Sequence, residues 1–233
     1  MTQAKSYHRD EVYLRNQELF ENIFKVTFKR VLKYKKKGKV LEIGSSTGVL
    51  LNLFRRDGWI AQGVEPSDKS AAYAIKIGIP TIKEKFENAK IKEKFDVVIL
   101  NHVLEHLEQP EKVLQKIHSL LNKRGIIAIN VPNAGSLSAK IYGASWKYVL
   151  PDEHLWQFTE KALKSLLEKN GFSVLSWEAK SGIWEFDNPI LELWQSFFGI
   201  KKRFLTNIIT ALPTLIVTKL KLGTGLSVIA IKK

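Results

Sequence analysis

The most informative segment of the sequence is a glycine-spaced turn at residues 42–48, which reads Glu-Ile-Gly-Ser-Ser-Thr-Gly. An apolar run leads into Gly44, and a helical pattern follows Gly48 directly. Glycines at such a turn let the backbone approach a ligand closely, and the N-terminus of the next helix offers unpaired N–H groups. The turn therefore suits a polar small ligand, although a tight turn without any ligand uses the same residues.

Two carboxylates accompany this turn. Glu65 ends the next apolar run, where a carboxylate can accept hydrogen bonds from both hydroxyls of a ribose. Glu42 lies inside the first apolar run, and a charge buried there needs a reason. A dinucleotide-binding enzyme also places an acid at the end of its second strand, but its turn reads G-x-G-x-x-G, whereas this one reads G-S-S-T-G. The spacing therefore disfavours a hydride-transfer enzyme.

Histidines form two further groups that could do chemistry. His154 stands in the segment Pro-Asp-Glu-His-Leu-Trp and is the best candidate for a general base, with a loop-anchoring role as the alternative. His102, Glu105 and His106 form an H-x-x-E-H pattern. On a helix, the two histidines share one face at a metal-compatible spacing. The alternative, which we favour, is that Glu105 and His106 fix the loop, so we expect no metal.

The elements that position these residues alternate along the chain. Apolar runs predict strands at 39–44, 59–66, 79–83, 95–101, 125–133, 172–180 and 226–233. Helical periodicity and capping residues predict helices at 10–36, 47–56, 67–77, 109–121 and 159–170, with an irregular, aromatic-rich stretch at 134–158. Strands that alternate with helices of this length indicate an α/β fold with a mainly parallel sheet.

Three parts of the chain follow from this pattern. Residues 1–38 form an N-terminal helical cap, residues 39–185 and 224–233 form the ligand-binding domain, and residues 186–223 are an apolar and basic insertion. We favour a packing of this insertion as helices on the domain core; a lid, a dimer face and an element on a membrane surface are the alternatives. Its apolar run at 204–218 is short and interrupted by Pro213, which disfavours a membrane span.

Composition narrows the function classes. The chain has 233 residues, no cysteine and a formal net charge of +14 from 37 basic and 23 acidic residues. Disulfides, thiolate catalysis and cysteine-bound zinc are excluded, and a cytoplasmic location, with membrane-peripheral contact through 186–222 as an option, is expected. The charge suits nucleic acid, an anionic membrane or an acidic substrate. A lysine-rich solvated surface explains it equally simply, and we favour that reading.

Five motifs in order resemble one family. They are LEIGSSTG at 41–48, GVEPS at 63–67, FDVVILNHVLEHL at 95–107, LLNKRGIIAINVPN at 120–133 and EHLWQFT at 153–159. Together they resemble the class I S-adenosylmethionine-dependent methyltransferases, and within them the broad family of ubiquinone O-methyltransferases and sugar or polysaccharide methyltransferases. The resemblance spans roughly residues 38–180. It implies a Rossmann-like, mainly parallel seven-stranded sheet with helices on both faces and an antiparallel last strand.

The resemblance also implies roles for single residues. The methionine-binding turn consists of Glu42, Gly44, Ser45, Ser46 and Gly48, with Glu65 on the ribose, Phe86 or Glu87 at the adenine, Asn101 and His102 beneath the sulfonium, and His154 toward the acceptor. Ser46 replaces a glycine of the family pattern, where its side chain either crowds the methionine carboxylate or donates a hydroxyl to it. Ubiquinone-type relatives carry E-x-x-E-H as a divalent-metal motif, whose first acid is His102 here.

The expected function is therefore methyl transfer from S-adenosylmethionine, with S-adenosylhomocysteine as product. Such a reaction needs alignment and at most one base, so no catalytic triad is expected. The expected acceptor is a hydroxyl on a small, glycan-linked, or lipid- or quinone-like molecule. Alternatives are an RNA methyltransferase, disfavoured because Asn-His-Val-Leu follows the fourth strand in place of N/D-P-P-Y/F, and a non-catalytic cofactor-binding scaffold. The oligomeric state stays open.

Overall fold

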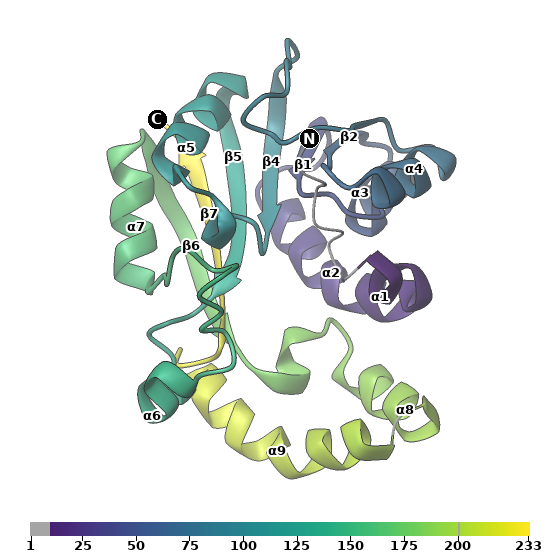
Figure 1. Ribbon diagram of the computed structural model, residues 1–233, viewed down its shortest axis with the longest axis vertical. Coiled ribbons are helices and arrows are strands. Elements are labelled where there is room, and N and C mark those ends of the chain that lie inside the picture. The colour runs from purple at the N-terminus through teal and green to yellow at the C-terminus, as the bar shows by residue number, and fades with distance from the viewer. Residues whose placement is uncertain (1–9, 200) are drawn as a thin grey trace.

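The computed structural model describes residues 10–199 and 201–233 (Figure 1). Its strands are β1 (Lys39–Ile43), β2 (Ile60–Val64), β3 (Thr81–Ile82), β4 (Phe95–Asn101), β5 (Leu121–Pro132), β6 (Phe172–Lys180) and β7 (Gly225–Lys232). Its α-helices are α1 (Asp10–Arg15), α2 (Gln17–Leu32), α3 (Val49–Arg56), α4 (Asp68–Lys76), α5 (Pro110–Leu120), α6 (Leu137–Tyr142), α7 (Glu160–Lys169), α8 (Pro189–Gly199) and α9 (Lys201–Lys219). Short 3₁₀ turns are η1 (Leu104–His106), η2 (Gly143–Ser145) and η3 (Gly182–Glu185). Residues 1–9 of the expected cap lie outside the described residues.

The strands form one seven-stranded sheet in the order β3-β2-β1-β4-β5-β7-β6. β1 pairs in parallel with β2 and β4, whereas β7 pairs antiparallel with β5 and β6. The prediction of a mainly parallel sheet with an antiparallel last strand is confirmed. Strand order reverses between β1 and β4, and the crevice at the carboxyl ends of strands beside such a reversal is where open α/β sheets bind ligands.

Side chains alternate between two cores, one on each face of the sheet. On β4, Val97 and Ile99 belong to one core, while Val98 and Leu100 belong to the other. The first core is completed by α2, α3 and α4 and the second by α5 and α7. This arrangement explains why the inner strands read as nearly continuous apolar runs, since helices cover both of their faces.

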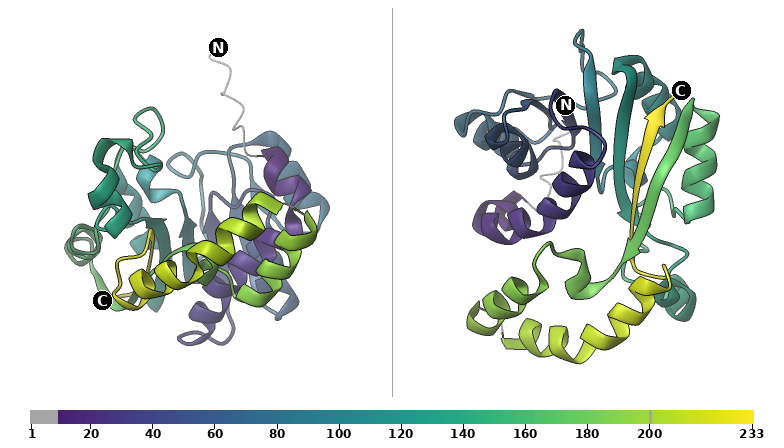
Figure 2. Two further views of the ribbon diagram at one scale, coloured as in Figure 1. Left: turned by 90° about the horizontal axis from the view of Figure 1, so that it is seen from below. Right: turned by 180° about the vertical axis from the view of Figure 1, so that it is seen from behind.

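The insertion forms a helical hairpin of α8 and α9 beyond the carboxyl ends of the parallel strands (Figures 1 and 2). The chain leaves β6 through η3 and returns into β7, which fixes the hairpin at this edge. A second connection comes from α2. The side chain of Asn22 makes two hydrogen bonds to the backbone of Asn188, and Lys29 forms a 2.7 Å ion pair with Asp187.

Three predicted boundaries were wrong. The helix expected at 10–36 is broken at Asn16, whose non-helical backbone separates α1 from α2, and it ends at Leu32, before a run of lysines. β5 starts at Leu121, because Leu121 pairs with Phe95 before an irregularity that returns the register at Ile126. The irregular stretch 134–158 contains the short elements α6 and η2. The helix α9 also continues through Pro213.

Candidate functional site

The turn after β1 is held in a fixed, partly strained conformation. The N–H groups of Gly44 and Ser45 donate to the carbonyl of Val64 on β2, at 2.8 and 3.2 Å. Gly44 and Gly48 have φ values of 68° and 75°, which glycine adopts without steric cost. Ser46 has φ 45°, where an L-residue with a side chain is disfavoured. The turn therefore keeps a glycine-like backbone at the position where the sequence carries serine.

Glu65 is anchored directly behind this turn. Its two carboxylate oxygens accept 2.8 Å hydrogen bonds from the N–H groups of Ser46 and Ser67. Ser67 in turn caps α4, because its side chain accepts from the N–H of Ser70. The carboxylate is buried, fixed at the end of β2, and oriented by two backbone donors. Such a fixed acceptor suits a vicinal pair of hydroxyls.

Glu42 is a buried carboxylate with one oxygen to spare. Its Oε1 accepts a 3.0 Å hydrogen bond from Asn101 at the end of β4, while Oε2 is buried without a hydrogen-bond partner among the described residues. Burial raises the pKa of Glu42 to about 8, since desolvation and the charge of Glu65 outweigh the hydrogen bond from Asn101. An unpaired buried carboxylate oxygen is costly, and a cationic ligand group would compensate it.

Polar residues that the sequence analysis missed continue this network. Asn130 of β5 donates both to Asn101 and to the hydroxyl of Thr27 on α2, the latter at 3.0 Å. A polar chain thus runs from α2 through the sheet to Glu42. Asn130 was detectable in principle, because it is an amide within an otherwise apolar strand.

The loop after β4 connects the glycine-spaced turn to the histidines. A side chain at Gly44 would clash with Val103, since a Cβ there would lie 2.5 Å from Val103 Cγ2. His102 has φ 52° and a half-exposed side chain, with Nδ1 3.3 Å from Oε1 of Glu105. Strained backbone of this kind clusters at functional sites. One short segment therefore touches the turn at one end and reaches the histidine group at the other.

Glu105, His106 and His154 come together at the far end of this loop. Their ligand-type atoms all lie within 4.8 Å of one another, and the two imidazole rings pack edge to face at 4.7 Å. His106 Nδ1 donates to the carbonyl of Glu153 at 2.7 Å, and His154 Nδ1 donates to that of Tyr148 at 2.8 Å. A carbonyl only accepts, so each neutral ring carries its lone pair on Nε2. Of the H-x-x-E-H pattern, His102 is therefore replaced by His154 in the cluster.

Phe86, which the resemblance assigns to the adenine, is buried in the core on the face of the sheet that α5 covers. Its ring is buried in the core under the ammonium of Lys116, which lies 4.7 Å from the ring centroid. The same ammonium also donates to the carbonyls of Phe86, Glu87 and Ala89. The loop after β3 is therefore tied down by Lys116, and its phenylalanine supports the fold at this point.

Glu185, in η3 at the base of the hairpin, was also missed. Burial raises the pKa of Glu185, although the hydrogen bond from Thr224 and the nearby charges of Lys147 and His102 lower it. The influence of His102 means that this carboxylate stands near the half-exposed end of the site. Nothing in the local sequence Gly-Ile-Trp-Glu signals this position, since it depends on where the insertion folds back.

A family model described as a methyltransferase domain matches residues 14–176, which is more than half of the chain. The chain belongs to the methyltransferase domain family. The match includes α2, the glycine-spaced turn, the loop after β4 and His154, and it ends before the α8–α9 hairpin. The hairpin is thus among the segments that the family model leaves out.

Sequence relatives are distant. The methyltransferase is 34% identical over 123 residues to an uncharacterized protein of Methanocaldococcus jannaschii, covering 52% of this chain and 58% of that protein. It is 26% identical over 187 residues to the human mitochondrial ubiquinone biosynthesis O-methyltransferase, covering 71% of this chain and 50% of that enzyme. The chain therefore spans between half and three fifths of the length of these relatives.

Solved structures share the fold. The chain is similar to a SAM-dependent methyltransferase from Thermotoga maritima, with a TM-score of 0.63 and 19% identity over 97% of this chain and all of that one. It is also similar to magnesium protoporphyrin IX methyltransferase from Synechocystis with bound SAH, with a TM-score of 0.59 and 16% identity over 97% and 88% of the two chains. With the family match, these likenesses confirm the methyltransferase family and the class I fold, and the solved relatives bind or depend on S-adenosylmethionine or its product.

The residues at the carboxyl edge fit this cofactor chemically. S-adenosylmethionine carries an ammonium group, a carboxylate and a ribose. The buried Oε2 of Glu42 lacks a donor among the described residues, and so does the buried hydroxyl of Ser45 beside it. Glu65 provides a fixed acceptor, and the N-terminus of α3 offers backbone N–H groups for an anion.

Proposed function

We propose that this methyltransferase binds S-adenosylmethionine through Glu42, Gly44, Ser45, Ser46, Gly48, Glu65, Asn101 and His102, and methylates a hydroxyl group. When bound, the cofactor supplies an activated methyl group and leaves as S-adenosylhomocysteine. Glu42 would hold the ammonium group, which explains its spare buried oxygen, and Glu65 would hold the ribose hydroxyls. His102, whose Nδ1 lies 3.3 Å from Oε1 of Glu105, would face the acceptor from the loop after β4.

The observation that carries this proposal is the continuity of the loop after β4. It contacts Glu42 through Asn101 and Gly44 through Val103, and it places Glu105 beside His154. The cofactor-binding residues and a buried histidine with a basic Nε2 are thereby built into one edge. His154 would take the proton of the acceptor hydroxyl as the new oxygen–carbon bond forms. Alignment of the acceptor supplies the rest of the rate.

A second role for the histidines rests on the cluster itself. Two imidazoles whose Nδ1 groups donate to carbonyls, together with a buried carboxylate, form the usual ligand set of a borderline transition metal. Nitrogen-rich ligands favour Zn²⁺ over Mg²⁺. We therefore propose Glu105, His106 and His154 as the ligands if this enzyme uses a metal, in place of the pattern that includes His102.

The acceptor class is proposed from the chemistry of the site and from the relatives. The human relative is named as an O-methyltransferase of ubiquinone biosynthesis, which supports a phenol- or quinol-type hydroxyl. A glycan hydroxyl is the second option. Aromatic side chains beside the site, including the partly exposed Trp156, suit a planar or sugar ring.

The test compares His154→Ala with His118→Ala, a histidine on α5 outside the site. Methyl transfer from labelled S-adenosylmethionine is measured with a dihydroxybenzoate, a methyl glucoside and a short RNA as probes. Loss of the base should lower the rate on the best hydroxyl acceptor about 100- to 1000-fold, while calorimetry shows unchanged cofactor affinity. Full activity of His154→Ala contradicts the base. Labelling of RNA alone contradicts the proposed acceptor class.

Metal content decides between the two histidine roles. The purified protein is analysed for bound transition metals, and zinc is titrated into chelator-treated wild type and His106→Ala. Stoichiometric zinc binding that His106→Ala abolishes supports the metal ligand role. If zinc does not bind to the wild type, His154 keeps only the role of base.

A further inference from the structure

The α8–α9 hairpin has an inverted distribution of polarity. On α8, the buried positions are polar, since Glu192 and Ser196 are almost completely inaccessible. The opposite face is apolar, and Ile190 and Trp194 expose 79% and 64% of their surface. A helix that packs against a protein in water normally turns its apolar face inward. On α8 the apolar face is turned away from the protein.

Helix α9 repeats this arrangement. Its inner face packs on η3 and β6, where the carbonyl of Ala211 accepts from Trp184 and the hydroxyl of Thr218 accepts from the N–H of Ser181. The outer face carries an apolar side chain every three or four residues. These exposed side chains are Leu205, Ile209, Leu212, Ile216 and Leu220, with Ile208 at their border. Ile209 is 73% exposed. This spacing places the exposed apolar side chains on the face of α9 opposite the one that packs on η3 and β6.

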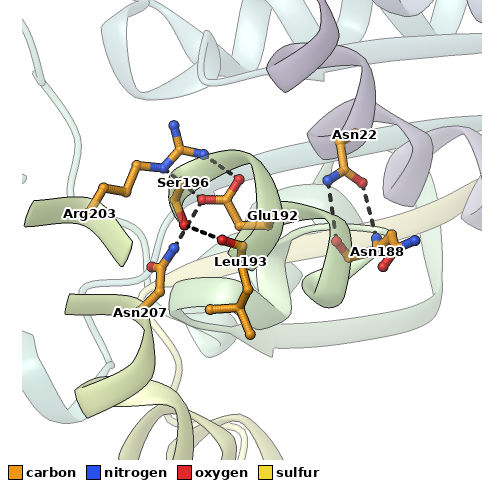
Figure 3. A network of polar contacts seen from close by, with 7 residues as sticks. All are labelled: Asn22, Asn188, Glu192, Leu193, Ser196, Arg203 and Asn207. Atoms are coloured by element: carbon orange, nitrogen blue, oxygen red, sulfur yellow. Dashed lines mark hydrogen bonds and ion pairs between the residues drawn. The ribbon is translucent and has the colours of Figure 1, made fainter. Parts of the chain in front are cut away.

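A polar network holds the two helices in this orientation (Figure 3). The carboxylate of Glu192 accepts two hydrogen bonds from the guanidinium of Arg203 and a 3.0 Å hydrogen bond from Asn207. Ser196 donates to the carbonyl of Leu193 within the same helix. Because Glu192 is buried and its partners come from α9, rotation of either helix would break this ion pair. The outward apolar faces are therefore specified by the structure.

Exposed apolar side chains are concentrated in the α8–α9 hairpin. Of the 20 large hydrophobic side chains that are exposed in the described chain, 10 lie between residues 190 and 220. Single exposed apolar residues are ordinary on a protein surface, whereas a contiguous set marks an interaction surface. We call these ten side chains the hairpin face. They are Ile190, Leu191, Trp194, Phe197, Leu205, Ile208, Ile209, Leu212, Ile216 and Leu220.

The charge around the hairpin face selects its partner. No acidic residue follows Glu192 in the sequence, whereas Lys201 and Lys202 begin α9 and Lys219 and Lys221 lie at and just beyond its end. A second copy of the chain would set these cationic ends against each other without a counter-charge. An anionic bilayer offers an apolar layer for the hairpin face and phosphate groups for the basic residues at both ends of α9. No helix of the described chain is long and apolar enough to cross a bilayer.

We propose that the hairpin face docks on the surface of an anionic lipid bilayer, with α8 and α9 lying in the interface. The hairpin lies beyond the carboxyl ends of the parallel strands, and both of its helices pack on η3, which carries Glu185 (Figure 1). Docking therefore brings the edge that holds the methyl-transfer site to the membrane. This inference concerns binding alone and does not depend on which acceptor is methylated.

The test measures flotation of the full-length protein with phosphatidylcholine vesicles, with and without phosphatidylglycerol. The protein should float with the anionic vesicles and detach as salt is raised. The double variant Ile209→Asp/Leu212→Asp should lose at least about tenfold in vesicle affinity, because charge replaces two exposed apolar side chains that would insert into the bilayer. The matched control is Ile75→Asp on α4, an exposed isoleucine outside the hairpin, which should bind like wild type.

Two results would overturn the proposal. One is that the wild type stays with the solution fraction when anionic vesicles float. The other is that the double variant binds them as well as the control does. Sedimentation equilibrium without lipid tests whether a second copy of the chain covers the hairpin face instead. If the wild type is a dimer, the double variant is a monomer and neither floats with vesicles, the hairpin face is a dimer interface. Calorimetry with S-adenosylhomocysteine checks that each variant is folded.

Discussion

Two buried carboxylates, Glu42 at the cofactor end and Glu192 in the hairpin, contrast two uses of the same chemical group. Both are nearly inaccessible to water. Glu192 is paired with Arg203 and Asn207, so its burial is compensated within the protein. Glu42 keeps one oxygen without a hydrogen-bond partner among the described residues, beside a turn with strained backbone. An uncompensated buried acid indicates a ligand, whereas a compensated one indicates architecture.

The surfaces of the two regions contrast in the same way. At the cofactor end, Glu42 and Glu65 lie at the carboxyl edge of the sheet, and helices cover the sheet with their apolar faces. The hairpin encloses its polar groups and presents apolar side chains outward. The first arrangement suits a polar small molecule, and the second suits an apolar medium. Four predictions test how independent the two regions are, from the largest expected effect to the smallest.

Removal of the ribose acceptor should have the largest effect on cofactor binding. Glu65→Ala deletes the carboxylate that the N–H groups of Ser46 and Ser67 orient. Cofactor affinity should fall about 100-fold, because two charge-assisted hydrogen bonds to the ribose hydroxyls are lost. Calorimetric titration with S-adenosylhomocysteine measures it. The matched control is Glu84→Ala, an exposed acid after β3. An affinity within about threefold of wild type would show that Glu65 only anchors the turn.

Opening the hairpin network should affect stability locally and leave the cofactor end intact. Glu192→Ala strands the guanidinium of Arg203, which is partly exposed, so the hairpin should lose about 2 kcal/mol of local stability. Hydrogen exchange should accelerate in α8 and α9, while cofactor affinity stays unchanged. If the affinity falls together with hairpin protection, the two regions are coupled, and the comparison above fails.

The pH dependence of stability should reveal Glu42. Its pKa is about 8 in the folded protein against 4.5 ordinarily, so the folded state binds more protons between these values. Stability should therefore fall as pH rises from about 4.5 to about 8, by at most about 1.4 kcal/mol per pH unit. Glu42→Gln removes this contribution. Chemical denaturation of both proteins across this range measures the difference, and parallel curves would rule out the raised pKa.

The smallest effect concerns backbone strain in the turn. Ser46→Gly places glycine where φ is 45°, which should relieve up to about 1 kcal/mol of strain, partly offset by the greater freedom of the unfolded chain. Thermal denaturation should show an equal or slightly higher melting temperature. Gly44→Ala is the opposite change, because a Cβ there meets Val103 at 2.5 Å, and it should destabilise. Destabilisation by Ser46→Gly would mean that the serine side chain itself holds the turn.

Much of the fold was predictable because its signals are local. The apolar runs that became β1, β4 and β6 are short and separated by turn residues, and capping residues such as Thr159 mark helix starts. The same locality placed Glu42 and Glu65 at the ends of neighbouring strands. Boundaries failed where a local feature competed with periodicity, as at Asn16, which divides a continuous helical pattern.

The sequence by itself determined the α/β alternation, the glycine-spaced turn and the family, because each is written in adjacent residues. Only the tertiary structure decided that His154 joins Glu105 and His106, that Asn130 extends the Glu42 network, and that Phe86 is buried in the core. It also decided which way the insertion faces. An apolar helix pattern fixes which side chains share a face, but the direction of that face depends on distant contacts such as Glu192 with Arg203.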